Sequence, residues 1–273
     1  MDRRRFLKTA AGLFVPAIPA IIRPDKARAQ GGMGPGPGTV HSTGGGGLGL
    51  QTSCTGFWSF ETGSWTDDTA SATTLTATGS PTSTNTAPAL VGNYLALPGS
   101  AYLTAASNSN IVTAGGSFSV QMWIYSPGSP GSVAFGKGTS GFGNAEWSLG
   151  SRFSGSNKWS FFHYDSSSNV TNADDSASIT NNVWVHLVAT YDSATKGLTL
   201  YKNGASVGTA TATNAVQSTT NEISIGRGAF GGAGVATGYR FDQCGFWKGR
   251  ILSAGDVTSL YNSGAGLSWA GML

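Results

Sequence analysis

Charged residues are scarce in this sequence and make up only 11% of its 273 positions. Surface helices usually carry a charged or polar face, so this scarcity argues against a helical bundle. Glycine occurs 41 times, among many serines, threonines and asparagines, which favour turns and a neutral polar surface. Aromatic residues, at 11%, supply apolar bulk for one sizeable core.

Excess positive charge is absent from most of the chain, although the formal net charge is +3. Seven of the sixteen basic residues and two of the thirteen acidic ones lie within residues 1–29. The remainder carries nine basic and eleven acidic side chains. A surface without excess positive charge does not attract polyphosphates, which argues against nucleic acid or an anionic membrane as a partner.

Glutamate occurs only three times, at Glu61, Glu146 and Glu222. Glycosidases need two carboxylates that flank the scissile bond, and no strand here carries an alternating acidic pattern. The sequence also lacks a nucleophile elbow, a phosphate-binding loop and a Cys-x-x-Cys motif. It therefore predicts a protein without catalytic residues. A diverged glycosidase that uses a cross-strand pair of Glu146 and Asp165 is the alternative.

The chain has no run of about 20 apolar residues that would span a membrane. Its N-terminal apolar stretch, residues 10–22, is shorter and is interrupted by Pro16 and Pro19. A basic start precedes this stretch and Ala27-Arg28-Ala29 follows it, as in an export signal. We expect a signal peptide over residues 1–29 and no membrane span after its removal; a retained anchor helix is the alternative.

The basic start, Arg3-Arg4-Arg5-Phe6-Leu7-Lys8, resembles the twin-arginine motif, with Asp2 in place of the usual serine. The resemblance implies export of an already folded domain to the periplasm, the cell surface or the medium. Residues 30–52 are rich in glycine and proline and cannot bury apolar area, so they are expected to form a flexible segment, either a tether that presents the domain or an unstructured tail.

From residue 53 onward, short apolar or alternating segments are separated by glycine, serine, asparagine and aspartate clusters, which is typical of a β-sandwich. The predicted strands are residues 56–60, 94–97, 101–103, 117–125, 132–137, 147–152, 158–164, 183–192, 197–202, 205–211, 223–226 and 239–247. Asn203-Gly204 predicts a type I′ hairpin turn. Ser253 and Asp256 form a capping box for one short helix over residues 253–262, with Gly264 placed to end it.

Three blocks of sequence resemble laminin-G-like domains of the concanavalin A-like lectin/glucanase type. The first is Phe57-Trp58-Ser59-Phe60-Glu61-Thr62-Gly63-Ser64. The second pairs residues 184–192 (WVHLVATYD) with residues 198–204 (LTLYKNG), and the third combines residues 225–226, 241–243 and 251–262. The resemblance covers residues 56–269. It implies an all-β, two-sheet antiparallel jelly-roll sandwich with one short C-terminal helix, which we assign to residues 53–273.

Relatives with this fold bind carbohydrate or protein partners, in some cases with calcium. The resemblance therefore predicts an exported binding or adhesion module for carbohydrate or a cell-surface glycoconjugate. A structural or self-associating surface or appendage protein, including one of phage origin, is the alternative. Aromatic side chains form the usual platforms for sugars, and the better candidates are Phe142 and Phe230 in glycine-rich loops, followed by Tyr164, Trp65 and Trp269.

Two departures from the family pattern remove acidic side chains: Leu97-Pro98-Gly99 replaces an Asp-Gly pair, and Gln243 replaces an acid beside Asp242. Both argue against a calcium site of the family type. Asp174 and Asp175 in a polar loop, together with Asp242, are the remaining candidate calcium ligands. The other interpretation is that the first two are solvated and that Asp242 binds turn amides.

The resemblance also bears on the cysteines and on one histidine. It places the first and last strands of the domain side by side, which predicts a disulfide between Cys54 and Cys244; two buried free thiols are the alternative. His186 occupies the structural Trp-x-His position of the family. We expect it to be a packed, hydrogen-bonded core residue.

Overall fold

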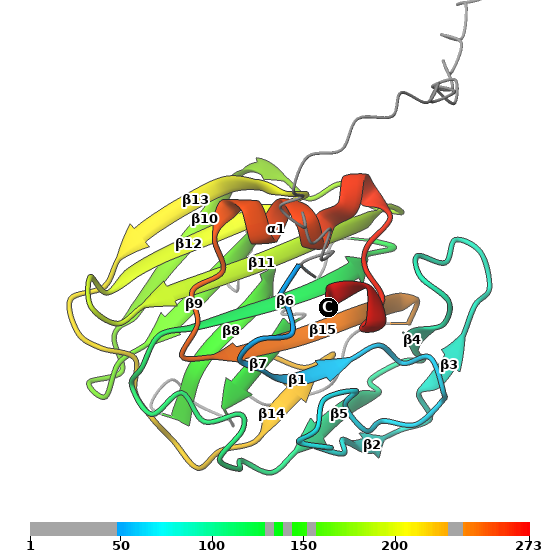
Figure 1. Ribbon diagram of the computed structural model, residues 1–273, viewed down its shortest axis with the longest axis horizontal. Helices are drawn as coiled ribbons and strands as arrows, with labels where there is room; N and C mark the ends of the chain where they lie inside the picture. Colours follow the sequence, from blue (N-terminus) through cyan, green and yellow to red (C-terminus); the bar gives the residue numbers. More distant parts are fainter. Residues whose placement is uncertain (1–47, 129–133, 139–143, 152–156, 229–236) are drawn as a thin grey trace, which may run out of the picture. The chain divides into compact units, whose positions relative to one another are not determined.

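The computed structural model describes residues 48–128, 134–138, 144–151, 157–228 and 237–273. The chain divides into two compact units, and every described residue belongs to the second, Gly45–Leu273. The residues of the expected signal motif, Arg3, Arg4, Phe6, Leu7 and Lys8, lie outside the described residues. The second unit consists of antiparallel strands with one short α-helix near its C-terminal end (Figure 1).

Two antiparallel sheets form the second unit. One has the order β13-β12-β11-β6-β15-β4-β3, with β1 also paired to β15, and the other has the order β10-β9-β8-β7-β14-β5-β2. We call these the first and the second sheet. The strands of the first sheet are β1 (Cys54–Trp58), β3 (Thr82–Thr84), β4 (Tyr94–Leu97), β6 (Phe118–Tyr125), β11 (Trp184–Asp192), β12 (Gly197–Lys202), β13 (Ala205–Thr211) and β15 (Tyr239–Lys248). Those of the second are β2 (Thr76–Thr78), β5 (Tyr102–Ala105), β7 (Ala134–Gly138), β8 (Ala145–Ser151), β9 (Lys158–Tyr164), β10 (Val170–Ser178) and β14 (Ile223–Ile225).

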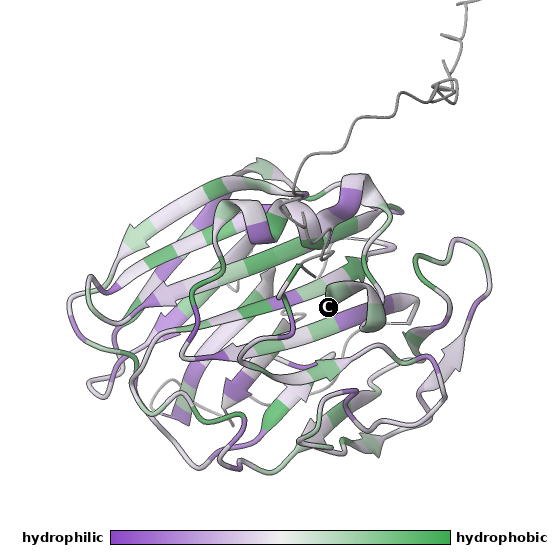
Figure 2. Cartoon of the chain, viewed as in Figure 1, coloured by the Kyte–Doolittle hydropathy of each residue, from purple (hydrophilic) through white to green (hydrophobic). Residues whose placement is uncertain are grey.

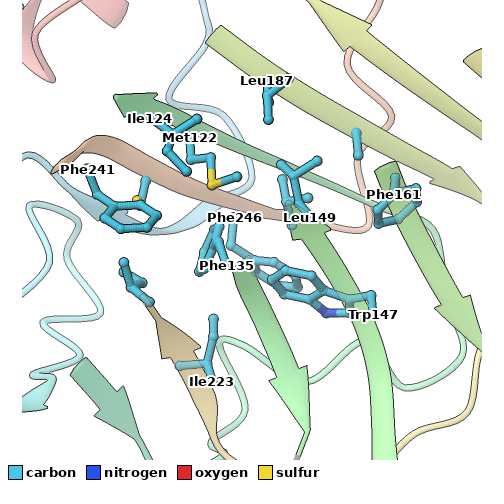
Figure 3. Close-up of a cluster of buried hydrophobic side chains, with 14 of the residues drawn as sticks. Met122, Ile124, Phe135, Trp147, Leu149, Phe161, Leu187, Ile223, Phe241 and Phe246 are labelled. Carbon is cyan, nitrogen blue, oxygen red and sulfur yellow. The ribbon is translucent and has the colours of Figure 1, made fainter. Parts of the chain in front are cut away.

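The main core lies between the two sheets, where alternate side chains of each strand meet. Strand β6 turns Phe118, Val120, Met122 and Ile124 inward, all with no exposed surface. Side chains of the second sheet pack against them from the other side, as Figure 3 shows for Phe135, Trp147, Leu149, Phe161 and Ile223. Each such side chain contributes about 1.5–3 kcal/mol through removal from water. The alternation of hydrophobic and hydrophilic residues is visible along the strands (Figure 2).

A second apolar cluster lies on the other face of the first sheet, beneath helix α1 (Ala254–Tyr261) (Figure 1). Val257 and Leu260 of the helix pack there with Phe57, Val188 and Trp247 of the sheet. Ser253 caps the helix and closes the predicted capping box with Asp256. Asn262, in the left-handed conformation, ends it two residues earlier than the expected Gly264.

The first and last described residues meet on this face. Strand β1 pairs with β15, and the amide of Leu50 donates to the carbonyl of Met272 at 3.0 Å. The Leu48 amide likewise donates to the carbonyl of Leu273. The earliest and latest described residues are therefore held together through their backbones. Within the described part of the chain, no helix has the length and apolar character of a membrane span.

The structure confirms the two-sheet sandwich, and four predicted strands (β4, β9, β12 and β13) have the predicted bounds. Asn203 and Gly204 have φ angles of 51° and 84°, as the predicted turn requires. Strands β2, β3 and β10 were not predicted. Strand β10 lies at a sheet edge and buries only Ala173 and Asp175, so it lacks an apolar period, and the polar loop expected at Asp174 and Asp175 is a strand.

The prediction of a disulfide is wrong, because Cys54 and Cys244 are both buried free thiols in the structure. Their strands are neighbours, as predicted, but the register places Cys54 opposite Trp247 and Cys244 opposite Trp58. Cys54 packs in the cluster beneath α1, whereas Cys244 faces the main core. The two side chains thus project from opposite faces of the sheet, which prevents a bond between them.

Candidate ligand-binding site

Three aromatic side chains gather on the outer face of the first sheet, toward the β3 edge. Tyr125 is the last residue of β6, and Trp184 is the first residue of β11, which pairs with β6 in the sheet. The two residues are cross-strand partners, and both are half-buried. Their ring centroids lie 5.9 Å apart, and Tyr94 of β4 meets Trp184 at 5.8 Å. Both contacts are edge-to-face, a favourable arrangement for aromatic rings.

Arg240 of β15 lies between two of these rings. Its guanidinium carbon is 4.8 Å from the ring centroid of Tyr94 and 4.7 Å from that of Tyr125. A guanidinium over an aromatic face is attracted by the ring quadrupole. Strand pairing explains the meeting, because Arg240 is opposite Ala96 on one side and opposite Tyr125 on the other.

Backbone carbonyls of the connection between β3 and β4 accept hydrogen bonds from this group of side chains. The carbonyl of Pro88 accepts from Trp184 Nε1 at 3.1 Å and from Arg240 Nη1 at 2.8 Å. The carbonyl of Thr86 accepts from the Tyr94 hydroxyl at 2.9 Å. These bonds fix the polar ends of Trp184, Arg240 and Tyr94, so the arrangement of these side chains is preorganised.

A cavity of about 310 Å³ opens beside the aromatic group. Tyr94 and Arg240 contribute to its wall, so the cavity and the aromatic group are continuous. The remaining lining residues are Thr82, Ala96, Leu97, Pro98, Thr237, Gly238 and Tyr239. Several of them are exposed, so solvent reaches the cavity. It joins apolar walls to a few polar groups, which is the usual character of a small-ligand site.

Two acidic side chains lie near this connection without pairing to Arg240. Asp242 accepts from the amides of Gln243 at 2.7 Å and Val91 at 3.5 Å, as expected of a residue that binds backbone amides. Glu61 accepts from the Asn93 amide at 2.9 Å. Burial raises the pKa of Asp242 well above its usual value, and the negative charge of Glu61 adds to this rise. The two acids serve to anchor residues 91–93.

Of the sequence-predicted ligand residues that the structure describes, none belongs to this aromatic group. Phe142 and Phe230 lie outside the described residues. Tyr164 has no exposed surface and packs with Ala145 and Phe162, so the expectation of an exposed platform fails for it. Trp65 is half-buried against Phe60, at a centroid distance of 6.2 Å.

The three candidate calcium ligands are not brought together. Asp174 and Asp175 belong to the second sheet and Asp242 to the first. Asp175 forms an ion pair with Lys202, and Asp174 accepts from Ser160 and Asn172. No cluster of three acidic, histidine or cysteine ligands occurs among the described residues. The residues that the structure describes therefore do not fit a calcium site built from these side chains.

The alternative catalytic pair also has other partners. Glu146 is fully buried in an ion pair with Lys137 and accepts from Thr113 and Thr219. Asp165 accepts from Asn169 and Asn214, and these hydrogen bonds lower its pKa to about 2.

His186 is packed as expected. It stacks on Trp123, its Nε2 lies 3.3 Å from Gln121 Oε1, and burial lowers its pKa to about 3.

The residues of the aromatic group were all within predicted strands, yet sequence reasoning did not single them out. Their signal is positional: Tyr125, Trp184 and Arg240 occupy outward-facing positions of strands whose inward positions are apolar. Contiguous apolar surface formed by such outward-facing aromatic side chains is typical of a ligand or partner site. Which of them meet, however, depends on the order of the strands in the sheet.

Comparison with known proteins agrees with the fold. The sequence model of a family described as the concanavalin A-like lectin/glucanases superfamily matches residues 97–258. No curated protein sequence matches the chain.

Several solved structures have a similar fold. Domain 4 of AbnA, a GH43 extracellular arabinanase from Geobacillus stearothermophilus in complex with arabinotriose, has a TM-score of 0.61 at 15% identity, with 76% of this chain and 97% of that one covered. The binding domain of Paraclostridial Mosquitocidal Protein 1 has a TM-score of 0.61 at 15% identity, covering 78% and 53%. The binding domain of Botulinum Neurotoxin DC in complex with SialylT has a TM-score of 0.59 at 16% identity, covering 78% and 52%. The chain thus spans about half the length of these two toxin domains.

Proposed function

Because the chain belongs to the concanavalin A-like lectin/glucanase superfamily, we propose that it is an exported, non-catalytic module that binds carbohydrate. The observation that carries the proposal is the half-buried aromatic pair Tyr125 and Trp184 beside an open cavity. Sugar rings have apolar faces and polar edges, and a site of aromatic rings with a few fixed polar groups suits both.

The neighbouring folds support a binding role. AbnA domain 4 was solved with arabinotriose, and the Botulinum Neurotoxin DC binding domain with SialylT. The carboxylates considered for catalysis, Glu146 and Asp165, are held by other side chains of this chain. A binding module therefore accounts for the site better than a hydrolase does.

Export is the second part of the proposal and depends on Arg3, Arg4, Phe6, Leu7 and Lys8. Their match to the twin-arginine motif supports a route for an already folded domain. On this view the glycine-rich segment expected at residues 30–52 links the signal region to the binding domain. Its last residues, from Leu48 onward, are already part of that domain, because Leu48 and Leu50 pair with Leu273 and Met272.

A glycan array followed by titration of the strongest ligand tests the binding proposal. Trp184→Ala and Tyr125→Ala should each weaken binding by about tenfold or more, or about 1.4 kcal/mol. Trp269→Ala is the matched control, because Trp269 is also half-buried but packs on Phe57 at 5.3 Å and contacts neither Tyr94, Tyr125 nor Trp184. Phe230→Ala tests the loop platform expected from the sequence. Loss of binding in Phe230→Ala with full binding in Trp184→Ala would move the site to that loop.

A further inference from the structure

The guanidinium of Arg240 is fixed in place but is not fully used by the protein. Tyr94 and Tyr125 hold it from two sides, at 4.8 Å and 4.7 Å. Its Nη1 donates to the carbonyls of Pro88 and Thr86, at 2.8 Å and 3.4 Å. Nε and Nη2 donate to no group of the described chain, which leaves one edge of the planar fork available.

Among the described residues, Arg240 also has no acidic side chain as a partner. Within the part of the chain that the structure describes, no carboxylate lies within 4 Å of its nitrogens. Asp242, two residues further along β15, binds backbone amides instead. A half-buried guanidinium loses part of its hydration, and here ring faces and backbone carbonyls replace it, so an anionic ligand would add a charge-assisted interaction.

A second arginine of the chain shows the contrasting arrangement. Arg227 lies over the ring of Tyr102 at 4.3 Å, as Arg240 does over its tyrosines. Arg227, however, is paired with the carboxylate of Glu222. Of these two arginines that lie over tyrosine rings, the one without a carboxylate is the one that lines the cavity.

From this geometry we infer that the cavity binds saccharides that carry a carboxylate group, such as uronic acid units. The inference rests on the proposed carbohydrate-binding function and specifies its ligand. The free edge of Arg240 matches a carboxylate, which a guanidinium binds through two parallel hydrogen bonds. The apolar walls formed by Ala96, Leu97 and Pro98 receive the uncharged face of the sugar ring.

Oligogalacturonate and its full methyl ester form a matched pair of probes, since they share the sugar backbone and differ in charge. The purified chain should bind the acid at least about tenfold more tightly than the ester. Arg240→Gln should abolish this preference, and Arg240→Lys, which keeps the charge but not the fork, should retain only part of it. Arg227→Gln should leave it unchanged. Thermal melting of each variant identifies any that fail to fold. If Arg240→Gln does not fold, Arg240→Lys alone tests the inference.

Equal affinity for the acid and the ester would overturn the inference, and so would a preference that survives in Arg240→Gln. A sulfated galactan oligomer bound as tightly as the carboxylate would also overturn it. Neutral glycan binding that depends on Trp184 would in those cases keep the proposed function intact. Absence of binding to every saccharide, charged or neutral, would instead remove the proposed function.

Discussion

Lys137 Nζ lies 2.9 Å from Glu146 Oε1, and neither side chain has any exposed surface. The ammonium also donates to the carbonyls of Thr219 and Asn221, at 2.9 Å and 2.8 Å. The pair therefore joins strands β7 and β8 to the chain segment before β14. Charges removed from water in this way are tolerated only while each keeps its partners.

Loss of one partner of this pair should be strongly destabilising. Glu146→Ala leaves the buried ammonium of Lys137 without a counter-charge, and the free energy of unfolding should fall by about 3–5 kcal/mol. Urea unfolding measures the change. Glu222→Ala is the matched control, because its partner Arg227 keeps the ring of Tyr102 and Glu222 is 29% exposed; its loss should be smaller. Equal losses in the two variants would show that burial of the Lys137 pair carries no special cost.

The two cysteines should behave as buried thiols. Mass spectrometry of the purified chain should find the same mass with and without reductant. Alkylation should be slow in the native state, where Cys54 is 8% exposed and Cys244 not at all, and complete in denaturant. Burial raises the pKa of both thiols, which further lowers their reactivity. A mass lower by two hydrogens before reduction would contradict the register that separates them.

The buried histidines should make the fold sensitive to acid. Burial lowers the pKa of His163 from 6.5 to about 4, against an opposing effect of Asp165. The unfolded chain therefore binds the proton first as pH falls below 6.5, and stability is lost down to about pH 4. Between pH 6.5 and pH 5, His163 alone should account for a loss of about 1.5 kcal/mol.

Urea unfolding across this range, for the original chain and for His163→Phe, tests the histidine prediction. The variant should show a weaker dependence on pH, because only His186, with its pKa lowered to about 3, then contributes in the same direction. Asp165 does not interfere, since its lowered pKa places its own effect below this window. An unchanged slope in the variant would mean that His163 is not the titrating group.

The paired arginines of the signal should be required for export. Replacement of both Arg3 and Arg4 by lysine keeps the positive charge but removes the guanidinium groups, and it should leave precursor in the cytoplasm. Arg5→Lys is the matched control, because Arg5 occupies the variable position of the motif and its variant should still be exported. Cell fractionation with an antibody against the folded domain gives the readout. Normal export of the double variant would refute a twin-arginine route.

Much of the fold could be predicted because local patterns agreed with it. Strand β6 alternates apolar and polar positions over eight residues, and its apolar positions do face the core. Ser253 and Asp256 cap the helix through bonds that depend only on neighbouring residues. Strand β3, Thr-Ser-Thr, has no apolar residue, and its strand conformation arises from pairing with β4.

The candidate site could not be predicted in the same way. Tyr94, Tyr125, Trp184 and Arg240 come from four strands, and their meeting depends on the order and register of those strands. The cysteines illustrate the same limit: knowing that β1 and β15 are neighbours was insufficient, because a shift in register changes the partner and the face. Periodicity specifies which side of a strand faces inward, but not which side chains meet across the sheet.

The pairing of Leu50 with Met272 has a consequence for biosynthesis. During translation, strand β1 emerges before β15, and Leu50 emerges before Met272, so each must wait for its partner. Contacts of such long sequence separation form late and slowly. The domain can therefore complete its fold only after Met272 has emerged from the ribosome, and a transport route that accepts folded domains would leave time for this pairing before export.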